Sequence, residues 1–336
     1  MLKETIYAPI QSDLEAIEKI ISEQLRDEPN ADILAVNEFI LKAPGKRLRP
    51  ALMVLMFYAS VLDISLISKE LVRKLHQAAA AVELIHMASL IHDDIIDHAP
   101  IRHHQPSIQA KFGMEIGVVQ GVYLYALSLG LLSEAGNIEV LSRISYAVKT
   151  LCQGELSQVS DRNIIREISV YMSVLEQKTG VLFAVACECG IILSGASDLF
   201  RKKGALFGEK LGVVFQIADD YMDFMGDEKT LGKDPGQDFE LGEMTLPVLL
   251  LLDSAKSEEE RIEIEMLMSD SRSDEALLKL RDRVYASQAL YQTKEIAVAY
   301  LEKAEGCLEG FSDTIYKTSL EVLLGFVEQR AFASHV

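Results

Sequence analysis

Proline placement limits the folds open to this chain more than any other feature of its sequence. No proline occurs between Pro106 and Pro235, and none follows Pro247. Because proline removes a backbone hydrogen bond and clashes with the preceding turn, such long gaps permit long helices. Apolar residues recur at helical spacing in two proline-free stretches: Ile10, Leu14, Ile17, Ile21 and Leu25, then Leu206, Leu211, Val214, Ala218, Tyr221 and Phe224. With no sustained alternation of the strand kind, the sequence predicts an all-α helical bundle, a large single domain over residues 1–336.

Charge narrows the ligands that such a bundle can bind. The chain carries 51 acidic against 33 basic residues, a net charge of -18. This balance argues against nucleic acid, which needs a basic surface. An anionic substrate would need metal ions or local cations. The four cysteines show no metal-ligand spacing, and the first residues lack an apolar signal core, so we expect a cytoplasmic protein.

Residues 116–133 contain no charged residue. This uncharged segment is just long enough to be a membrane-span candidate. The segment contains glycines, serines, a glutamine and two tyrosines, and acidic residues flank it. We therefore expect a core helix surrounded by other helices rather than a membrane span.

Two aspartate clusters share one spacing. Asp93 and Asp97 lie four residues apart with Asp94 between them, and Asp219 and Asp223 repeat this pattern around Asp220. On a helix, residues four apart lie on one face. Apolar residues surround both clusters, and burying several carboxylates is costly unless they are neutralised. Mg²⁺ binds a few carboxylates together with water and phosphate oxygens, so two facing carboxylate walls are expected to hold a metal-bound diphosphate.

Five segments together resemble the motifs of trans-isoprenyl diphosphate synthases, the polyprenyl synthetase family. They occur in the family's order over more than half of the chain, and the pattern is most similar to that of the long-chain polyprenyl diphosphate synthases. The segments are GKRLRP at 45–50, ELIHMASLIHDDIID at 83–97, QKTG at 177–180, FQIADDYMDFMGDEKTLGK at 215–233 and TLP at 245–247.

This resemblance implies an isoprenoid synthase fold with a central active-site cavity and an enzyme that condenses isopentenyl diphosphate with an allylic prenyl diphosphate. The product is a longer all-trans polyprenyl diphosphate. The resemblance also implies Mg²⁺, about three ions per site, and a homodimer without nucleic acid that contacts membrane surfaces transiently.

The resemblance assigns a role to each motif residue. Asp93, Asp97 and Asp219 are the main metal ligands, supported by Asp94, Asp220 and Asp223. Cations grip the allylic diphosphate, while Thr179 and Gln216 lie near the reacting carbon, and basic or imidazole side chains bind isopentenyl diphosphate. The allylic cations are Arg102, Lys178 and Lys233, and the isopentenyl diphosphate residues are Lys46, Arg49 and His86, with His103 at a further position of that site.

Product length is expected to depend on the helix before Asp93. Ala88 and Ser89 lie about one turn before that motif, where short-chain members of the family carry an aromatic plug. One turn rises about 5.4 Å, so small residues leave room for a product longer than about fifteen carbons. The sequence does not fix the floor of the tunnel, for which Tyr123 and Tyr125 are candidates.

Three positions depart from the family pattern. His103 replaces an arginine, Val122 replaces an aspartate, and Glu243 replaces a lysine. Histidine is mostly neutral near pH 7 and forms no bidentate fork, so affinity for isopentenyl diphosphate is expected to fall.

These departures keep alternatives open. One is a catalytically weakened subunit of a heteromeric prenyl synthase, and another is a class I terpene cyclase. A ferritin-like di-metal bundle would need two Glu-x-x-His pairs, and only Glu83 and His86 fit that spacing clearly.

Overall fold

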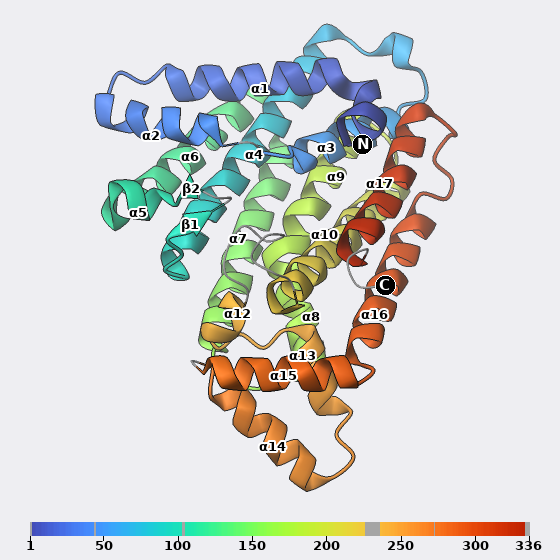
Figure 1. Ribbon diagram of the computed structural model, residues 1–336. Coiled ribbons are helices and arrows are strands. Elements are labelled where there is room, and N and C mark those ends of the chain that lie inside the picture. The colour runs from blue at the N-terminus through green and yellow to red at the C-terminus, as the bar shows by residue number, and fades with distance from the viewer. Residues whose placement is uncertain (1, 44, 103–104, 226–235, 272, 333–336) are drawn as a thin grey trace. The chain divides into compact units, whose positions relative to one another are not determined.

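The computed structural model describes residues 2–43, 45–102, 105–225, 236–271 and 273–332, and helices dominate these ranges (Figure 1). The only strands among them, β1 (Ile101–Arg102) and β2 (Gln105–Pro106), form one antiparallel pair in which Arg102 lies opposite Gln105. The predicted all-α fold is confirmed.

The helices pack into two compact units. The first unit comprises Met1–Val148, Leu182–Gly208 and Cys307–Leu323, and the second comprises Lys149–Val181, Glu209–Gly306 and Leu324–Val336. Five of the described helices contribute residues to both: α7 (Ile138–Ser160), α9 (Val181–Ser194), α10 (Asp198–Met225), α16 (Ala289–Cys307) and α17 (Ile315–Phe332). A single domain over residues 1–336 stays a prediction.

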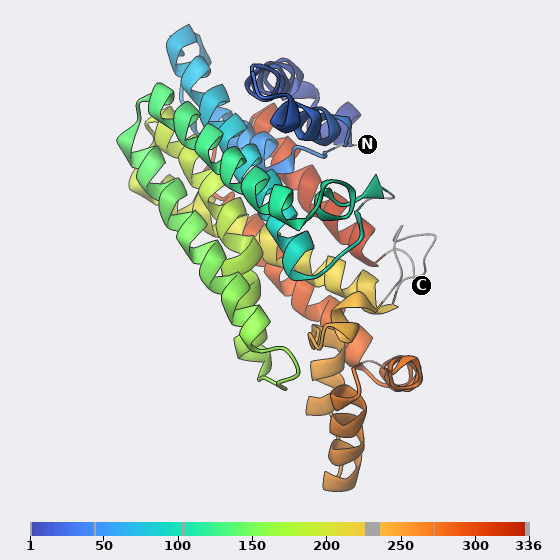
Figure 2. The same cartoon turned by 90° about the vertical axis from the view of Figure 1, so that its left-hand side faces the viewer.

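The first unit is built around α4 (Lys69–Ile96). Ser68 starts this helix by accepting a hydrogen bond from the Leu71 N–H at 3.1 Å. Helices α1 (Gln11–Arg26), α3 (Leu48–Ser60) and α6 (Met114–Ala135) contact α4, and α6 lies beside it in both views (Figures 1 and 2). The other elements are η1 (Leu2–Ile6), η2 (Ala8–Ile10), α2 (Ala31–Lys42), η3 (Ile64–Leu66), α5 (Ile108–Phe112) and most of α9 (Val181–Ser194).

The predicted apolar stripe of α1 is confirmed, because every residue from Ile10 to Leu25 in it is buried. The stripe predicted on α10 begins one residue later than expected. Leu206 is 43% exposed, whereas Phe207 is buried. Phe207 lies four residues before the buried Leu211, so it shares that face of the helix and Leu206 does not.

Helix α6 packs on α4 along one face only. A Cβ atom at Gly121 would lie 2.1 Å from His92 Nε2, so glycine is needed for this close approach. The opposite face exposes an apolar stripe that includes Val119, Val122 and Leu129. The helix is therefore not surrounded on all sides, contrary to the sequence expectation, because its apolar residues occupy both faces.

Among the described residues, two helical stretches are long and apolar enough to cross a membrane by length and composition: Met114–Ala135 and Ile168–Ser194. Their apolar windows are 39% and 61% buried within the protein. The second stretch is mostly buried, as core helices of globular proteins are, and two such stretches are weak evidence for a membrane span.

The second unit places α8 (Ile168–Leu175) against α13 (Leu246–Asp253). The apolar residues of α13 are all buried, and Pro247 lies in its first turn, where a missing N–H costs nothing. The remaining elements are η4 (Glu176–Gly180), α12 (Gln237–Glu240), α14 (Glu258–Ser269), α15 (Asp274–Ala286) and α16 (Ala289–Cys307).

Candidate active site

The first aspartate motif lies at the C-terminal end of α4. Asp94 is 4% exposed, whereas Asp93 and Asp97 are half-buried. Arg102 on β1 donates from Nε to both oxygens of Asp94, at 2.8 and 2.9 Å, and its Nη2 lies 2.7 Å from Oδ1. Such charge-assisted bidentate pairing holds the central carboxylate firmly. The more accessible Asp93 and Asp97 flank this ion pair.

The residues predicted to bind isopentenyl diphosphate include a compact group in the first unit. The guanidinium of Arg49 lies 4.4 Å from the centroid of the Phe183 ring, a cation–π contact. Burial, and then the charges of Arg49, Arg102 and Arg47, lower the pKa of His86 well below 6.5. His86 is therefore neutral near pH 7 and lies within electrostatic reach of two other predicted site residues.

Arg47, the middle basic residue of GKRLRP, has a different environment. Its backbone is left-handed, with φ at 51°, and its side chain pairs with Glu18 and with the buried Glu83, 3.1 Å away. Tyr7 donates a hydrogen bond to the Lys46 carbonyl at 2.9 Å. These contacts fix the turn that carries Lys46 and Arg49.

The second aspartate motif lies near the C-terminal end of α10. Asp219 is exposed, whereas Asp220 and Asp223 are 6% and 3% exposed. Asp223 Oδ2 accepts a hydrogen bond from the backbone N–H of Asp238 in α12 at 3.0 Å. The three aspartates of this motif therefore differ in exposure, because Asp219 is exposed whereas Asp220 and Asp223 are buried.

Neutral donors hold the central carboxylate of this motif. Asp220 accepts a hydrogen bond from the Tyr171 hydroxyl at 2.6 Å and another from Gln216 Nε2 at 2.8 Å. Thr179 in turn donates to Gln216 Oε1 at 2.7 Å. Burial is the main cause that raises the pKa of Asp220 to about 7. The predicted residues Thr179, Gln216 and Asp220 are thus joined in one hydrogen-bonded chain.

Lys178 and Thr179 lie in η4, a π-helical turn between α8 and α9. Such turns are frequent at functional sites. Lys178 Nζ is 2.8 Å from an oxygen of Glu155, whose side chain is 10% exposed. This partner holds Lys178 beside Gln216 on the wall of a cavity in the second unit.

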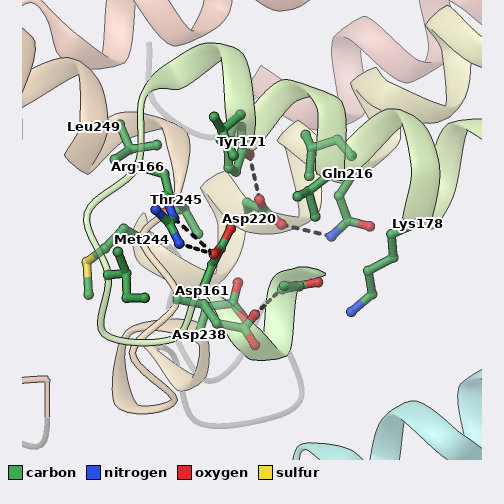
Figure 3. Close-up of a pocket in the computed structure, with 16 residues that line it drawn as sticks. Asp161, Arg166, Tyr171, Lys178, Gln216, Asp220, Asp238, Met244, Thr245 and Leu249 are labelled. Atoms are coloured by element: carbon green, nitrogen blue, oxygen red, sulfur yellow. Dashed lines mark hydrogen bonds and ion pairs between the residues drawn. The ribbon is translucent and has the colours of Figure 1, made fainter. Parts of the chain in front are cut away.

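Figure 3 shows this cavity of about 70 Å³, enough for several water molecules, with Tyr171, Asp220, Gln216 and Lys178 on its polar side. Its apolar lining comprises Ile164, Val170, Val174, Leu175, Met244 and Leu249. The cavity lies wholly within the second unit.

Glu243, the position of reversed charge, also lines the cavity but is paired. Both Nε and Nη2 of Arg162 lie 2.8 Å from Glu243 Oε1, and Gln158 donates to the other oxygen. Its side chain is 11% exposed. Glu243 is therefore charge-compensated by Arg162 within the second unit.

The remaining predicted positions differ in their surroundings. Ala88 and Ser89 are buried on α4, and Ser89 donates to the His86 carbonyl at 2.9 Å. Tyr123 donates to Glu28 at 2.9 Å, and Val122 is 58% exposed on α6. His103 and Lys233 lie outside the described residues.

Sequence reasoning missed Tyr171, Glu155 and Arg162. Tyr171 is the only polar aromatic residue of α8, which is a weak signal that its hydroxyl needs a buried partner. Glu155 and Arg162 carry no such signal, because their partners lie 23 and 81 residues away in the sequence.

The donor chemistry of both motifs fits a hard divalent cation. Among the described residues, no group of three or more acidic, histidine or cysteine side chains is gathered closely enough to hold a metal ion. Mg²⁺ is usually bound by one or two carboxylates, with water and substrate phosphates as its other ligands. The accessible Asp93, Asp97 and Asp219 offer such oxygens.

Comparisons with known proteins agree over nearly the whole chain. A family model described as polyprenyl synthetase matches residues 31–284. Heptaprenyl diphosphate synthase component 2 of Geobacillus stearothermophilus is 31% identical, over 92% of this chain and 93% of the relative. Octaprenyl diphosphate synthase of Escherichia coli (strain K12) is 29% identical, over 95% and 96%.

Solved structures share the fold. A polyprenyl synthase from Caulobacter crescentus CB15, solved in complex with calcium and isoprenyl diphosphate, has a TM-score of 0.88 at 28% identity and covers 97% of both chains. A decaprenyl diphosphate synthase from Rhodobacter capsulatus has a TM-score of 0.87 at 27% identity, with 97% and 98% covered.

The all-helical fold and its aspartate motifs define a prenyltransferase of the isoprenoid synthase type, an enzyme of prenyl chain elongation. The chain belongs to the polyprenyl synthetase family.

Proposed function

We propose that this enzyme elongates an allylic prenyl diphosphate with isopentenyl diphosphate, that it uses Mg²⁺, and that its all-trans product exceeds about fifteen carbons. The observation that carries the proposal is the pair of aspartate motifs. In each motif, a more accessible carboxylate lies next to a buried one that accepts hydrogen bonds from other side chains of the protein. The exposed or half-buried carboxylates lie where a hydrated metal ion can reach their oxygens.

Asp93, Asp97 and Asp219 would bind the Mg²⁺ ions, about three per site by family resemblance. Bound Mg²⁺ would neutralise the charge that develops on the departing diphosphate. Asp94 and Asp220 would support the metal ligands rather than serve as the main ones. Asp94 already accepts hydrogen bonds from Arg102, and Asp220 accepts them from Tyr171 and Gln216.

Cations of this chain would grip the diphosphates. Arg102 and Lys178 each hold an acidic partner, at 2.7 and 2.8 Å, that fixes the side chain before substrate arrives. Lys46, Arg49 and the neutral His86 would bind isopentenyl diphosphate, and charge-assisted hydrogen bonds to phosphate favour this role for the two cations.

The reaction requires a sheltered allylic cation. The carbon–oxygen bond to diphosphate breaks, the double bond of isopentenyl diphosphate attacks the cation, and loss of a proton restores a double bond. Thr179 donates its hydroxyl hydrogen to Gln216, so its oxygen lone pairs are available to stabilise positive charge. A low-water environment protects the cation.

Chain length would follow from the small buried residues Ala88 and Ser89 on α4. Neither side chain is large enough to close a tunnel. Several relatives are named for long products, among them octaprenyl and solanesyl diphosphate synthases. Replacing Ala88 with phenylalanine is expected to shorten the main product by at least one isoprene unit, measured by mass spectrometry.

We also propose that the enzyme is a homodimer. The exposed face of α6 carries Val119, Val122, Ala126 and Leu129, at the alternating spacing of three and four that suits a helix–helix seam. Leu129→Asp is expected to weaken the dimer in analytical ultracentrifugation. A monomeric wild type would instead favour a heteromer, a reading supported by the relative named as component 2.

Product analysis tests the proposed activity. Purified protein is incubated with isopentenyl diphosphate, Mg²⁺ and an allylic diphosphate primer that contains two, three or four isoprene units. We expect a ladder of products ending well beyond the longest primer, and none in EDTA. Folded protein that elongates no primer would contradict the proposal and favour a weakened heteromer subunit or a terpene cyclase.

A further inference from the structure

Helix α8 carries a tyrosine whose hydroxyl joins two separate parts of the second unit. Tyr171 donates to Asp220 Oδ2 at 2.6 Å. The backbone N–H of Leu246 acts on the same hydroxyl and opposes, less strongly than burial acts, the rise in the pKa of Tyr171. Leu246 is the first residue of α13, where backbone N–H groups have no partner within the helix. Figure 3 shows Tyr171 pointing at Asp220 above the cavity. One hydroxyl thus links the second aspartate motif to the TLP segment.

The contact with Tyr171 determines how Asp220 lies. The two carboxylate oxygens have different partners, Tyr171 on Oδ2 and Gln216 on Oδ1. A carboxylate held by two donors from different helices cannot rotate without losing one hydrogen bond. Because Asp220 is buried, an unmade hydrogen bond there is costly.

The orientation of the Asp220 carboxylate also sets the orientation of the Gln216 side chain. Its amide nitrogen donates to Asp220, so its amide oxygen faces away and accepts the Thr179 hydroxyl at 2.7 Å. If Asp220 turned, the Gln216 amide would lose the partner that sets its direction. The hydroxyl of Tyr171 therefore controls groups that it does not touch.

We propose that Tyr171 is a positioning residue of the active site, which orients Asp220 and through it the Gln216 amide, and so keeps Asp219 placed for a metal-bound diphosphate. This inference rests on the proposed function, because it assigns Asp219 to metal. Asp219 and Asp220 are adjacent on α10, so the hydrogen bond from Tyr171 on α8 to Asp220 tethers the turn of the helix that carries Asp219. Supporting partners of metal ligands typically change metal affinity by about 10–100-fold when removed.

The test compares Tyr171→Phe, which removes only the hydroxyl, with Leu252→Ala, which removes buried apolar packing on α13 away from the cavity lining. Thermal stabilisation by Mg²⁺ with inorganic pyrophosphate is measured for each full-length variant, together with the Mg²⁺ concentration that gives half-maximal product formation. We expect Tyr171→Phe to raise the half-maximal Mg²⁺ concentration about tenfold. Leu252→Ala is expected to lower the melting temperature but leave the Mg²⁺ response unchanged.

Asp220→Asn completes a double-mutant cycle. If Tyr171 acts through Asp220, the double variant loses no more Mg²⁺ response than the larger single variant. Additive losses would overturn the inference, as would a wild-type Mg²⁺ response in Tyr171→Phe.

Tyr171→His keeps an N–H donor and guards against a Tyr171→Phe protein that fails to fold. It is expected to retain more Mg²⁺ response than Asp220→Asn, and an equal loss would overturn the role of the donor. Failure of the proposed function itself is distinguishable, because the wild type would then show neither product nor stabilisation by Mg²⁺ with pyrophosphate.

Discussion

The two aspartate motifs have the same spacing but neutralise their central carboxylate differently. Asp94 is paired with a permanent cation, Arg102, whereas Asp220 is held by the neutral donors Tyr171 and Gln216. A guanidinium compensates the carboxylate charge at every pH of interest. Neutral donors orient the charge without cancelling it, and burial raises the pKa of Asp220 to about 7. Arg102 thus compensates the central carboxylate of the first motif, whereas no cation among the described residues is paired with Asp220, so we expect the second motif to gain more from a bound metal ion.

The largest expected effect comes from breaking the charged pair. Arg102→Leu leaves the buried Asp94 without its cation, and loss of one partner of a buried pair costs about 3–5 kcal/mol. Because the Arg102 side chain is 35% exposed, we expect a smaller loss, about 2–3 kcal/mol in the free energy of unfolding. Urea denaturation measures it. A loss no larger than that of Tyr171→Phe would remove the contrast between the motifs.

The second prediction concerns pH. The pKa of Asp220 in the folded protein, about 7, lies above its unfolded value of 3.8. The stability that its proton contributes is therefore fully present below about pH 4 and is lost as pH rises through 7. In metal-free protein, we expect wild type to lose stability relative to Asp220→Asn across this window, by at most about 1.4 kcal/mol per pH unit.

Melting temperatures of both proteins in EDTA between pH 4.5 and 8 measure this difference. Asp94→Asn serves as the matched variant in the first motif. A difference between wild type and Asp220→Asn that stays constant with pH would show that neutral donors compensate Asp220 as fully as Arg102 compensates Asp94.

The third prediction concerns the effect of a neighbouring charge, that of Glu243, on Asp220 in the second motif. The carboxylate of Glu243 contributes, after burial, to the raised pKa of Asp220. Glu243→Gln is expected to lower the pH at which half of the Asp220-dependent stability is lost, by less than about one unit. It also removes the ion pair with Arg162, at a cost of about 1 kcal/mol. Gln158→Ala, which leaves both charges in place, is the control, and an upward shift of the midpoint would contradict the assignment.

Much of this fold was predictable, because helices leave periodic signals in the sequence. The stripe from Ile10 to Leu25 is buried as predicted, and the error at Leu206 is one of register. The exposed face of α6 was not predictable, because an apolar helix facing solvent has the same composition as a core helix.

The site was predictable as a set of motifs but not as a set of contacts. The spacing of Asp219, Asp220 and Asp223 gave no reason to expect that only Asp219 is exposed. The Tyr171–Asp220 hydrogen bond joins residues 49 positions apart, and the Arg162–Glu243 ion pair joins residues 81 apart. Such distant pairs depend on how helices pack, which one sequence does not encode in any local pattern. The roles given to the site residues and the cytoplasmic location stay predictions.

The most direct test of this account is a Mg²⁺ titration of four variants, Asp93→Asn, Asp94→Asn, Asp219→Asn and Asp220→Asn, followed by product formation and by thermal stabilisation with pyrophosphate. The account predicts that the accessible positions, Asp93 and Asp219, lose Mg²⁺ response at least about tenfold more than the buried central positions, Asp94 and Asp220. Equal losses at all four positions, in proteins that remain folded, would contradict it.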